Sequence, residues 1–395
     1  MNDDFIFTSE SISRGHPDKL CDQVSDAIVD QFLRHDRHAG ITTECAISSG
    51  ILFIAARYAS VAKVDIPEVA RRVIRDVGYP NEVFNADNCS IMTSFVDRTR
   101  REYEPLDLDN LGDEAIDRIT AKHPITAFGY ACNQTPNLMP LPVWLAHRLA
   151  DALDAKKVRK KLPYLLPDGK SQVSVEYVNG RPKRLQSVTL VVSQLSEGTP
   201  DLAQLYDDLI ETVIHPVCAE AKHEPDADTL LFVNPEGGVV GGGPTYHSGR
   251  TGRKTGIATY GEYARHSGAA LSGKDPMRID RVAAYAARYA AKHLVAAGLA
   301  DECEVSLSYT VGAARPVSVR VRTQGTGEVD DHELANRVRE VFDFRVAAIV
   351  RDLGLRELPA KHKKGFYRLL AVHGQMGRTD LKAPWEETDK IDALK

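Results

Sequence analysis

Hydrophobic residues recur at helical spacing in three segments that share one register. Each segment begins with an aspartate and places apolar side chains four, eight and twelve positions later. Residues at this spacing lie on one stripe of a helix, and aspartate is a preferred N-cap. The pattern therefore predicts three capped amphipathic helices: Asp65 with Val69, Val73 and Val77; Asp201 with Leu205, Leu209 and Val213; Asp330 with Leu334, Val338 and Phe342.

Extended, β-rich sequence precedes each of these helices. It occupies 51–54 before the first, 174–177 and 187–192 before the second, and 306–311 and 317–321 before the third. Asn179 and Gly180 separate the second pair, as in a two-residue hairpin. The repeat predicts an α+β fold of three similar domains, over 1–101, 118–235 and 236–380. Coincidence is the alternative, since capped amphipathic helices are common.

Two further helices have clear start signals. Pro17 is a natural first helical residue, and the apolar residues that follow it, from Leu20 to Phe32, keep helical spacing. Asp275 and Pro276 form a cap and first-turn pair before an alanine-rich segment that ends at Gly298. We therefore expect one helix from Pro17 and another capped by Asp275.

Composition narrows the class of protein. The chain has 395 residues, 43% of them hydrophobic and 27% charged, which suggests a soluble protein of two or three domains. A formal net charge of -5 argues against a general binder of nucleic acid or membrane surfaces. The six cysteines are widely spaced and predict buried, reduced thiols. The acidic N-terminus and the lack of a long apolar run predict a cytoplasmic protein.

The stretch 9–19 carries the first candidate chemistry. His16 and Asp18 flank Pro17, so they lie at the mouth of the predicted helix. A helix start binds anions through its free N–H groups, and a carboxylate beside it is a ligand for Mg²⁺. This combination indicates a metal-chelated phosphate. A capped surface helix is the alternative.

Three more stretches combine glycine turns with charge: 168–173, 249–254 and 272–281. The second has adjacent cations at Arg253 and Lys254. It is not a Walker A loop, because Arg253 stands where that pattern needs glycine. In the third, Lys274 lies four residues before Arg278, near Asp280. Each stretch taken singly has a simpler interpretation: a solvated turn for 168–173, a basic surface turn for 249–254 and a salt-bridged helix start for 272–281.

Together, the four stretches resemble the S-adenosylmethionine synthetases (methionine adenosyltransferases) in order and spacing. The likeness runs from Phe7 to about Asp389 and includes the strings Phe-Gly-Tyr at 128–130 and Pro-Trp-Glu at 384–386. The resemblance implies three β-α-β-β-α-β domains around a pseudo-threefold axis. It also implies a homodimer or homotetramer, with sheets paired face to face and active sites at the dimer interface.

In that family the sulfur of methionine attacks C5′ of ATP, and the expelled triphosphate is hydrolysed to phosphate and diphosphate. The resemblance assigns catalysis to His16, Lys170, Arg253 and Lys274. It assigns ATP and triphosphate binding to these residues together with Asp168, Gly238, Val239, Lys254 and Ala270. It assigns the amino-acid substrate to Arg57, Arg98, His247 and Arg278. The implied metals are Mg²⁺ at Asp18 and Asp280, and K⁺ at Glu44.

The chain departs from the family pattern around the nucleoside and the amino acid. A glycine-rich acidic loop is replaced by 122–127, and a phenylalanine by Val239. Arg57 and His247 replace two carboxylates, Arg98 replaces a glutamine and Arg278 a lysine. These changes predict altered adenine binding and a thioether acceptor with more negative or less positive charge than methionine. A regulatory, non-catalytic paralogue and a triphosphate or nucleotide hydrolase are the alternatives.

Overall fold

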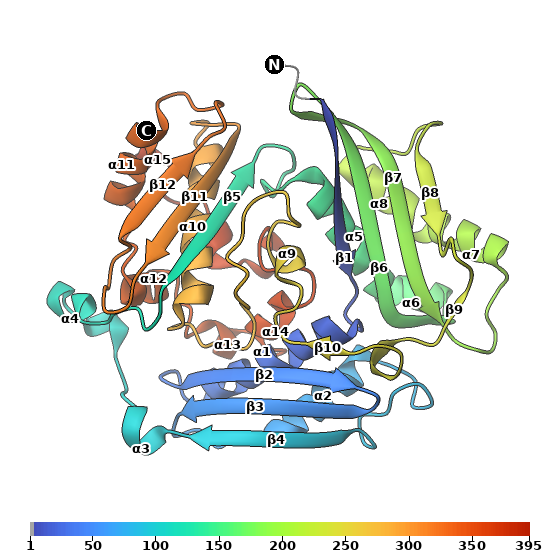
Figure 1. Ribbon diagram of the computed structural model, residues 1–395, viewed down its shortest axis with the longest axis horizontal. Helices are drawn as coiled ribbons and strands as arrows, with labels where there is room; N and C mark the ends of the chain where they lie inside the picture. The colour runs from blue at the N-terminus through green and yellow to red at the C-terminus, as the bar shows by residue number, and fades with distance from the viewer. Residues whose placement is uncertain (1–3) are drawn as a thin grey trace.

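Three β-sheets surround a central group of helices in the computed structural model, which describes residues 4–395 (Figure 1). Residues 1–3 of the acidic N-terminus, 1–4, lie outside the described part. One sheet consists of β1 (Phe5–Ile12), β6 (Leu165–Val178), β7 (Arg181–Gln194) and β8 (Leu230–Val233), with β9 (Val239–Val240) also paired to β7. The second consists of β10 (Gly249–Arg250), β2 (Gly40–Ser48), β3 (Ile51–Ala59) and β4 (Ser90–Asp97). The third consists of β12 (Ser318–Arg322), β11 (Glu302–Tyr309) and β5 (Ile125–Cys132).

The same order of elements occurs along the chain three times. The first pass is β1, α1 (Pro17–His35), β2, β3, α2 (Ile66–Val77) and β4. The second is β5, α5 (Leu141–Asp154), β6, β7, α7 (Leu202–Leu209) and β8. The third is β10, α10 (Ile279–Ala296), β11, β12 and α11 (Asp331–Val341), without a final strand among the described residues.

The first strand of each pass pairs with a sheet of another pass. β1 joins β6, β5 joins β11, and β10 joins β2, all antiparallel. The exchange closes in a ring, so each sheet contains a strand from outside its own pass. The division into 1–101, 118–235 and 236–380 stays a prediction, and the sheets cross those ranges.

Short helices fill the connections. They are α3 (Thr99–Glu102), η1 (Leu108–Asn110), α4 (Asp113–Asp117), α6 (Lys156–Lys161), η2 (Ile210–Ile214), α8 (His215–Ala221), η3 (Gly243–Thr245), α9 (Thr255–Ala258), α12 (Val346–Asp352), α13 (Leu358–Lys361), α14 (Phe366–Leu370), η4 (Thr379–Leu381), η5 (Pro384–Glu386) and α15 (Ile391–Leu394).

The three predicted N-caps are confirmed. The side chain of Asp65 accepts the amide of Glu68 at 3.0 Å, and that of Asp201 accepts the amide of Gln204 at 2.9 Å. Asp330 caps α11 in the same way through His332, at 2.8 Å. The predicted hairpin is also confirmed, because Asn179 and Gly180 both have positive φ, 51° and 72°, between β6 and β7.

The predicted cap at Asp275 is wrong. Helix α10 begins at Ile279, with Arg278 at the N-cap position and no side-chain cap. The carboxylate of Asp275 instead accepts the backbone amides of Ile41 at 2.9 Å and Met277 at 2.8 Å. The carboxylate that the local sequence predicted as a helix cap thus accepts a strand amide of β2 instead. The end of the helix is as expected, with Gly298 at φ 73°.

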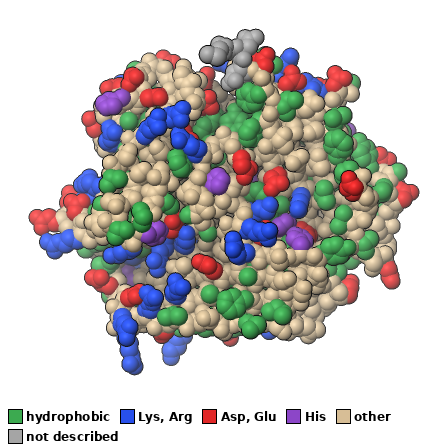
Figure 2. All heavy atoms as spheres, viewed as in Figure 1, with side chains coloured by type: hydrophobic (Ala, Val, Ile, Leu, Met, Phe, Trp, Pro, Cys, Tyr) green, Lys and Arg blue, Asp and Glu red, His purple; other side chains and the backbone are tan. Residues whose placement is uncertain are grey.

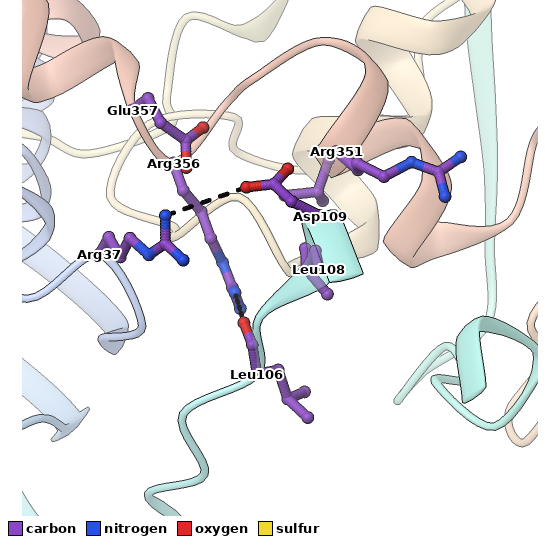
Figure 3. Close-up of a pocket in the computed structure, with 8 residues that line it drawn as sticks. Arg37, Leu106, Leu108, Asp109, Arg351, Arg356 and Glu357 are labelled. Carbon is purple, nitrogen blue, oxygen red and sulfur yellow. Dashed lines mark hydrogen bonds and ion pairs between the residues drawn. The ribbon is translucent and has the colours of Figure 1, made fainter. Parts of the chain in front are cut away.

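The segment between β4 and β5 is held by two arginines, Arg37 just after α1 and Arg356 between α12 and α13. Arg356 donates to the carbonyl of Leu106 at 2.9 Å, and Arg37 pairs with Asp109 at 3.9 Å (Figure 3). Arg37 also pairs with Asp107 at 3.1 Å. The pocket among these side chains measures about 10 Å³. That volume suits at most a single water molecule, so this is a packing contact.

The cysteine prediction is confirmed, since all six are free and buried. Among residues 4–395, no helix is both long and apolar enough to span a bilayer.

Buried histidines make the fold sensitive to acid, and His147 on α5 is the clearest case. Its Nδ1 lies 2.9 Å from the hydroxyl of Ser11, and burial, with Lys19 and Arg378 nearby, lowers its pKa to about 3. The unfolded chain takes up a proton below about pH 6.5, whereas the folded chain does so only near pH 3. Stability therefore falls as the pH drops through this window.

We predict that lowering the pH from 7 to 5 costs about 2 kcal/mol of unfolding free energy through His147 alone. His147→Gln should make the decrease in unfolding free energy between pH 7 and pH 5 smaller by this amount. Urea unfolding at both pH values measures it. His332→Gln, at an exposed position on α11, serves as the control. An unchanged pH difference in His147→Gln would contradict this account.

Candidate active site

His16 stands at the N-terminus of α1 with its orientation fixed. Its Nδ1 accepts the backbone amide of Asp18 at 3.2 Å, and the side chain is buried. Burial lowers the pKa of His16 to about 3, which outweighs the opposing influence of Asp168. The imidazole is therefore neutral. Because Nδ1 is an acceptor, the proton lies on Nε2, and the ring presents one N–H donor.

Gly249 explains how β10 reaches this helix start. A Cβ atom at Gly249 would lie 2.1 Å from the backbone carbonyl carbon of Pro17. Only glycine allows such an approach. The carboxylate of Asp18 accepts the amide of the next residue, Arg250, at 2.9 Å.

Asp168 and His247 complete a cluster around His16. Nε2 of His247 lies 2.8 Å from the carboxylate of Asp168, which also accepts the amide of Gly243 at 2.8 Å. Burial acts to raise the pKa of Asp168, but these hydrogen bonds lower it below its usual value. The rings of His16 and His247 lie 4.8 Å apart. An ionised carboxylate thus bonds to one imidazole and lies close to a second.

The three side chains have potential metal-ligand atoms within 4.8 Å of one another. A metal-bound histidine uses its second ring nitrogen as a donor. Nδ1 of His16 faces an N–H group and acts as an acceptor. We therefore interpret the cluster as a hydrogen-bonding site for an anion rather than a transition-metal centre.

Cations surround the same cluster. Lys170 follows Asp168 by two positions on β6. Lys170 and Lys254 both lie close enough to lower the pKa of His16. Lys254 also pairs with Glu10 at 3.3 Å, and Arg253 lies 4.0 Å from Asp18. Figure 2 shows Lys, Arg and His side chains gathered near the lower ends of β1 and β6. We use the name half-site 1 for this group, which consists of His16, Asp18, Asp168, Lys170, His247, Arg253 and Lys254.

A second cluster, half-site 2, lies at the start of β2. Nζ of Lys274 is 3.0 Å and Nε2 of His123 is 2.8 Å from the same oxygen of Asp280. The backbone of Lys274 bridges Thr42 on β2, and Thr42 lies opposite Arg57 on β3. Among the described residues, the side chain of Arg57 makes no hydrogen bond or ion pair.

Strand β2 sets the distance between the half-sites. Arg250 pairs with Ala46, whereas Lys274 pairs with Thr42, four residues away. This spacing separates the two backbones by about 13 Å. Glu44 lies between them on the same exposed face of β2. Within residues 4–395, no hydrogen bond or ion pair joins the two half-sites.

Other predicted site residues make contacts of their own. Arg278 pairs with Asp275 at 3.4 Å, and Arg98 pairs with Glu102 at 2.8 Å. Gly238 and Val239 lie where β9 meets Ser193 and Gln194 of β7. Ala270 packs against Gly252, where an added Cβ would come within 2.2 Å of it.

Sequence reasoning missed two kinds of contributor. His123 lies in the stretch 122–127, which was noted only because it differs from the family's glycine-rich loop. Nothing local in the sequence indicates its contact with Asp280. Asp22 and Asp26 received no role, although they continue from Asp18 at four-residue spacing on α1. On a helix with so many apolar positions, this spacing could have indicated a face of buried carboxylates with partners elsewhere in the chain.

We predict that His16 stays neutral, with its proton on Nε2, from pH 8 to pH 5. Long-range ¹H–¹⁵N correlation spectra of histidine-labelled protein would report this tautomer, with the His16→Gln spectrum supplying the assignment. Because burial excludes the proton, the His16 signals should not move over this range. An imidazolium signal at pH 5 would contradict the assignment.

Comparison with known proteins shows a full-length match. The models named "S-adenosylmethionine synthetase" match in order: the N-terminal domain at 4–99, the central domain at 118–239 and the C-terminal domain at 241–387. The S-adenosylmethionine synthase of Rippkaea orientalis is 43% identical over 408 residues, which cover 100% of this chain and 97% of that protein. That of Gloeobacter violaceus is 44% identical over 407 residues, with 99% and 97% covered.

Proposed function

The chain belongs to the S-adenosylmethionine synthetase family, and from this premise we propose that its two half-sites form S-adenosylmethionine from methionine and ATP. The sulfur attacks C5′, the bond from C5′ to oxygen breaks, and the triphosphate leaves before water cleaves it to phosphate and diphosphate. The observation that carries the proposal is half-site 1, where a neutral N–H donor is ringed by cations.

In this proposal, His16 assists departure by hydrogen bonding. Its Nε2–H donates to the oxygen that separates from C5′, where negative charge develops. Because the ring is neutral over the working pH range, it stabilises that charge without transferring a proton. Lys170, Arg253, Lys254 and Lys274 hold the triphosphate oxygens, and the sulfur needs no further activation.

The carboxylates suit the metals that the family uses. Within the described chain, Asp18 and Asp280 each keep one oxygen free of hydrogen bonds. Carboxylate oxygen is the preferred ligand of Mg²⁺, which would neutralise phosphate charge there. The exposed carboxylate of Glu44, between the half-sites, is proposed for K⁺.

A second copy of the chain would complete each site. The half-sites lie about 13 Å apart along β2, and the outer face of the same sheet is apolar. Ile51, Phe53 and Met92 are 48%, 42% and 58% exposed there. Pairing these faces in a homodimer or homotetramer would bring half-site 1 of one copy to half-site 2 of the other. We also propose that the three passes, with their ring of exchanged strands, are related by a pseudo-threefold axis.

The preferred acceptor is proposed to carry less positive or more negative charge than methionine, which also reacts. Arg57 is exposed and without an ionic partner in the described chain, opposite Thr42 at half-site 2. His247 forms a hydrogen bond with the carboxylate of Asp168. That carboxylate would otherwise be available to an ammonium group. Both features disfavour a cationic amino group nearby. A separate change concerns the nucleoside: Val239 provides no aromatic ring to stack on adenine, so adenine binding is proposed to be altered.

We expect the purified protein with ATP, Mg²⁺, K⁺ and methionine to yield a sulfonium product, identified by mass spectrometry. His16→Ala should lower kcat by about 10²–10³ through loss of one preorganised donor, while His332→Ala should match the native enzyme. Phosphate release without a sulfonium would identify a hydrolase instead. Absence of both products would contradict the proposal.

The acceptor proposal predicts a charge preference. In a panel of thioethers, those without a free ammonium group should give the higher kcat/KM, and Arg57→Glu should shift preference toward methionine. Arg57→Gln, which removes charge without reversing it, should fall between. The proposal fails if methionine is the best native substrate or if Arg57→Glu leaves the ranking unchanged.

A further inference from the structure

Four aspartates follow one another along a single face of α1. Asp18, Asp22, Asp26 and Asp30 are spaced four residues apart, and all are buried. Buried carboxylates are rare in proteins unless they have hydrogen-bonding or ionic partners. We call these residues the aspartate ladder.

Each carboxylate of the ladder accepts backbone amides from a distant segment. Asp18 accepts the amide of Arg250 at 2.9 Å, Asp22 that of Gly252 at 2.8 Å and Asp26 that of Gly273 at 2.8 Å. Asp30 accepts three amides at the start of α14, at 2.9 to 3.1 Å. Asp18, Asp22 and Asp26 therefore bind the two loops that carry the cations of the candidate site. Asp30 binds α14, which carries none of them.

We propose that Asp22 and Asp26 are positioning residues for the triphosphate-binding loops, an inference that rests on the proposed function. Asp22 fixes the loop that contains Arg253 and Lys254. Asp26 fixes the loop that contains Lys274. Neither carboxylate touches the substrate in this assignment, and each acts through the backbone that it holds.

Two independent elements agree on the spacing that the ladder imposes. Eight residues of helix separate Asp18 from Asp26, a rise of about 12 Å. The corresponding loops pair with Ala46 and Thr42 of β2, about 13 Å apart. Because helix and strand give the same length, α1 and β2 together fix the distance between the half-sites.

Buried cations complete the ladder. Lys19 pairs with Asp22 at 3.1 Å, and Arg281 pairs with Asp26 at 2.8 Å. Arg281 also donates to the carbonyl of Lys274 at 2.6 Å, so that loop is held at two successive residues. Gly273 is required there, since its φ is 79° and a Cβ would lie 2.1 Å from the carbonyl oxygen of Thr43.

Asp22→Ala and Asp30→Ala form a matched pair that separates positioning from stability. Both remove a buried carboxylate from the same face of α1, but only Asp22 holds a cation-bearing loop. Binding of inorganic tripolyphosphate with Mg²⁺ would be measured by calorimetry on the full chain, with thermal unfolding in parallel. Asp22→Asn, which keeps an acceptor oxygen for the amide of Gly252, is the conservative variant.

We expect Asp22→Ala to bind tripolyphosphate about 10- to 100-fold more weakly than the native protein, the loss typical of a charge-assisted hydrogen bond. Asp22→Asn should recover part of that loss. Asp30→Ala should unfold at a lower temperature yet keep native affinity. The proposal is overturned if Asp22→Ala binds like the native protein, or if Asp30→Ala weakens binding equally. Should Asp22→Ala not fold, the same comparison applies to Asp22→Asn.

Hydrogen exchange supplies a readout that does not depend on the proposed function. Asp22→Asn should speed amide exchange in 249–254, and Asp30→Asn should speed it in 366–370 only. If the native protein binds no tripolyphosphate but these shifts occur, the proposed function fails and the loop-holding role of Asp22 stands. Unchanged exchange in 249–254 would overturn that role.

Discussion

The hydrogen bonds from buried carboxylates of α1 to distant backbone amides are the contacts on which the candidate site depends. Two loops separated by about twenty residues, 249–254 and 272–275, are held by these bonds together with short strand pairing and side-chain bonds such as those of Thr251 to Ser25 and of Arg281 to the carbonyl of Lys274. An ionised oxygen buried beside an amide makes a stronger bond than a neutral acceptor. Burial raises the pKa of Asp22 and of Asp26, and the paired cations Lys19 and Arg281 act against that rise. The first helix therefore acts as a scaffold for sequence more than two hundred residues away.

Strand exchange adds a second constraint at the level of the whole fold. Each sheet contains a strand that another pass supplies, and the exchange closes in a ring. The three parts are thus expected to fold as one cooperative unit. The exchanged strands also carry chemistry to the junctions. β10 brings Arg250 to α1, and β1 leads directly into His16. The site lies where these exchanges meet.

Electrostatics around His16 then decides what the site can do. Burial and nearby lysines keep the imidazole neutral, while hydrogen bonds keep Asp168 ionised. A neutral donor, an anion and several cations in one place suit a reaction in which phosphate charge develops at an oxygen. His247 belongs to this cluster through its bond to Asp168, whereas Arg57 presents an exposed positive charge beside half-site 2.

The sequence by itself determined the features that depend on neighbours within a few positions. The caps at Asp65, Asp201 and Asp330, the turn at Asn179 and Gly180, and the helix from Pro17 all rest on contacts inside one turn. The family resemblance was also readable, because its motifs are short strings. The sequence predicted the residues of both half-sites except His123, but not how they divide into two groups or the spacing between those groups.

Only the tertiary structure decided the contacts between distant segments. Asp275 looked like a cap, yet an amide of β2 takes its carboxylate, because a strand amide left without a partner would cost more than an uncapped helix start. The ring of exchanged strands, the pairing of His247 with Asp168 and the amides bound by Asp22 and Asp26 are likewise hydrogen bonds across long stretches of chain. No local pattern encodes such bonds, since their partners meet only when the whole chain has folded.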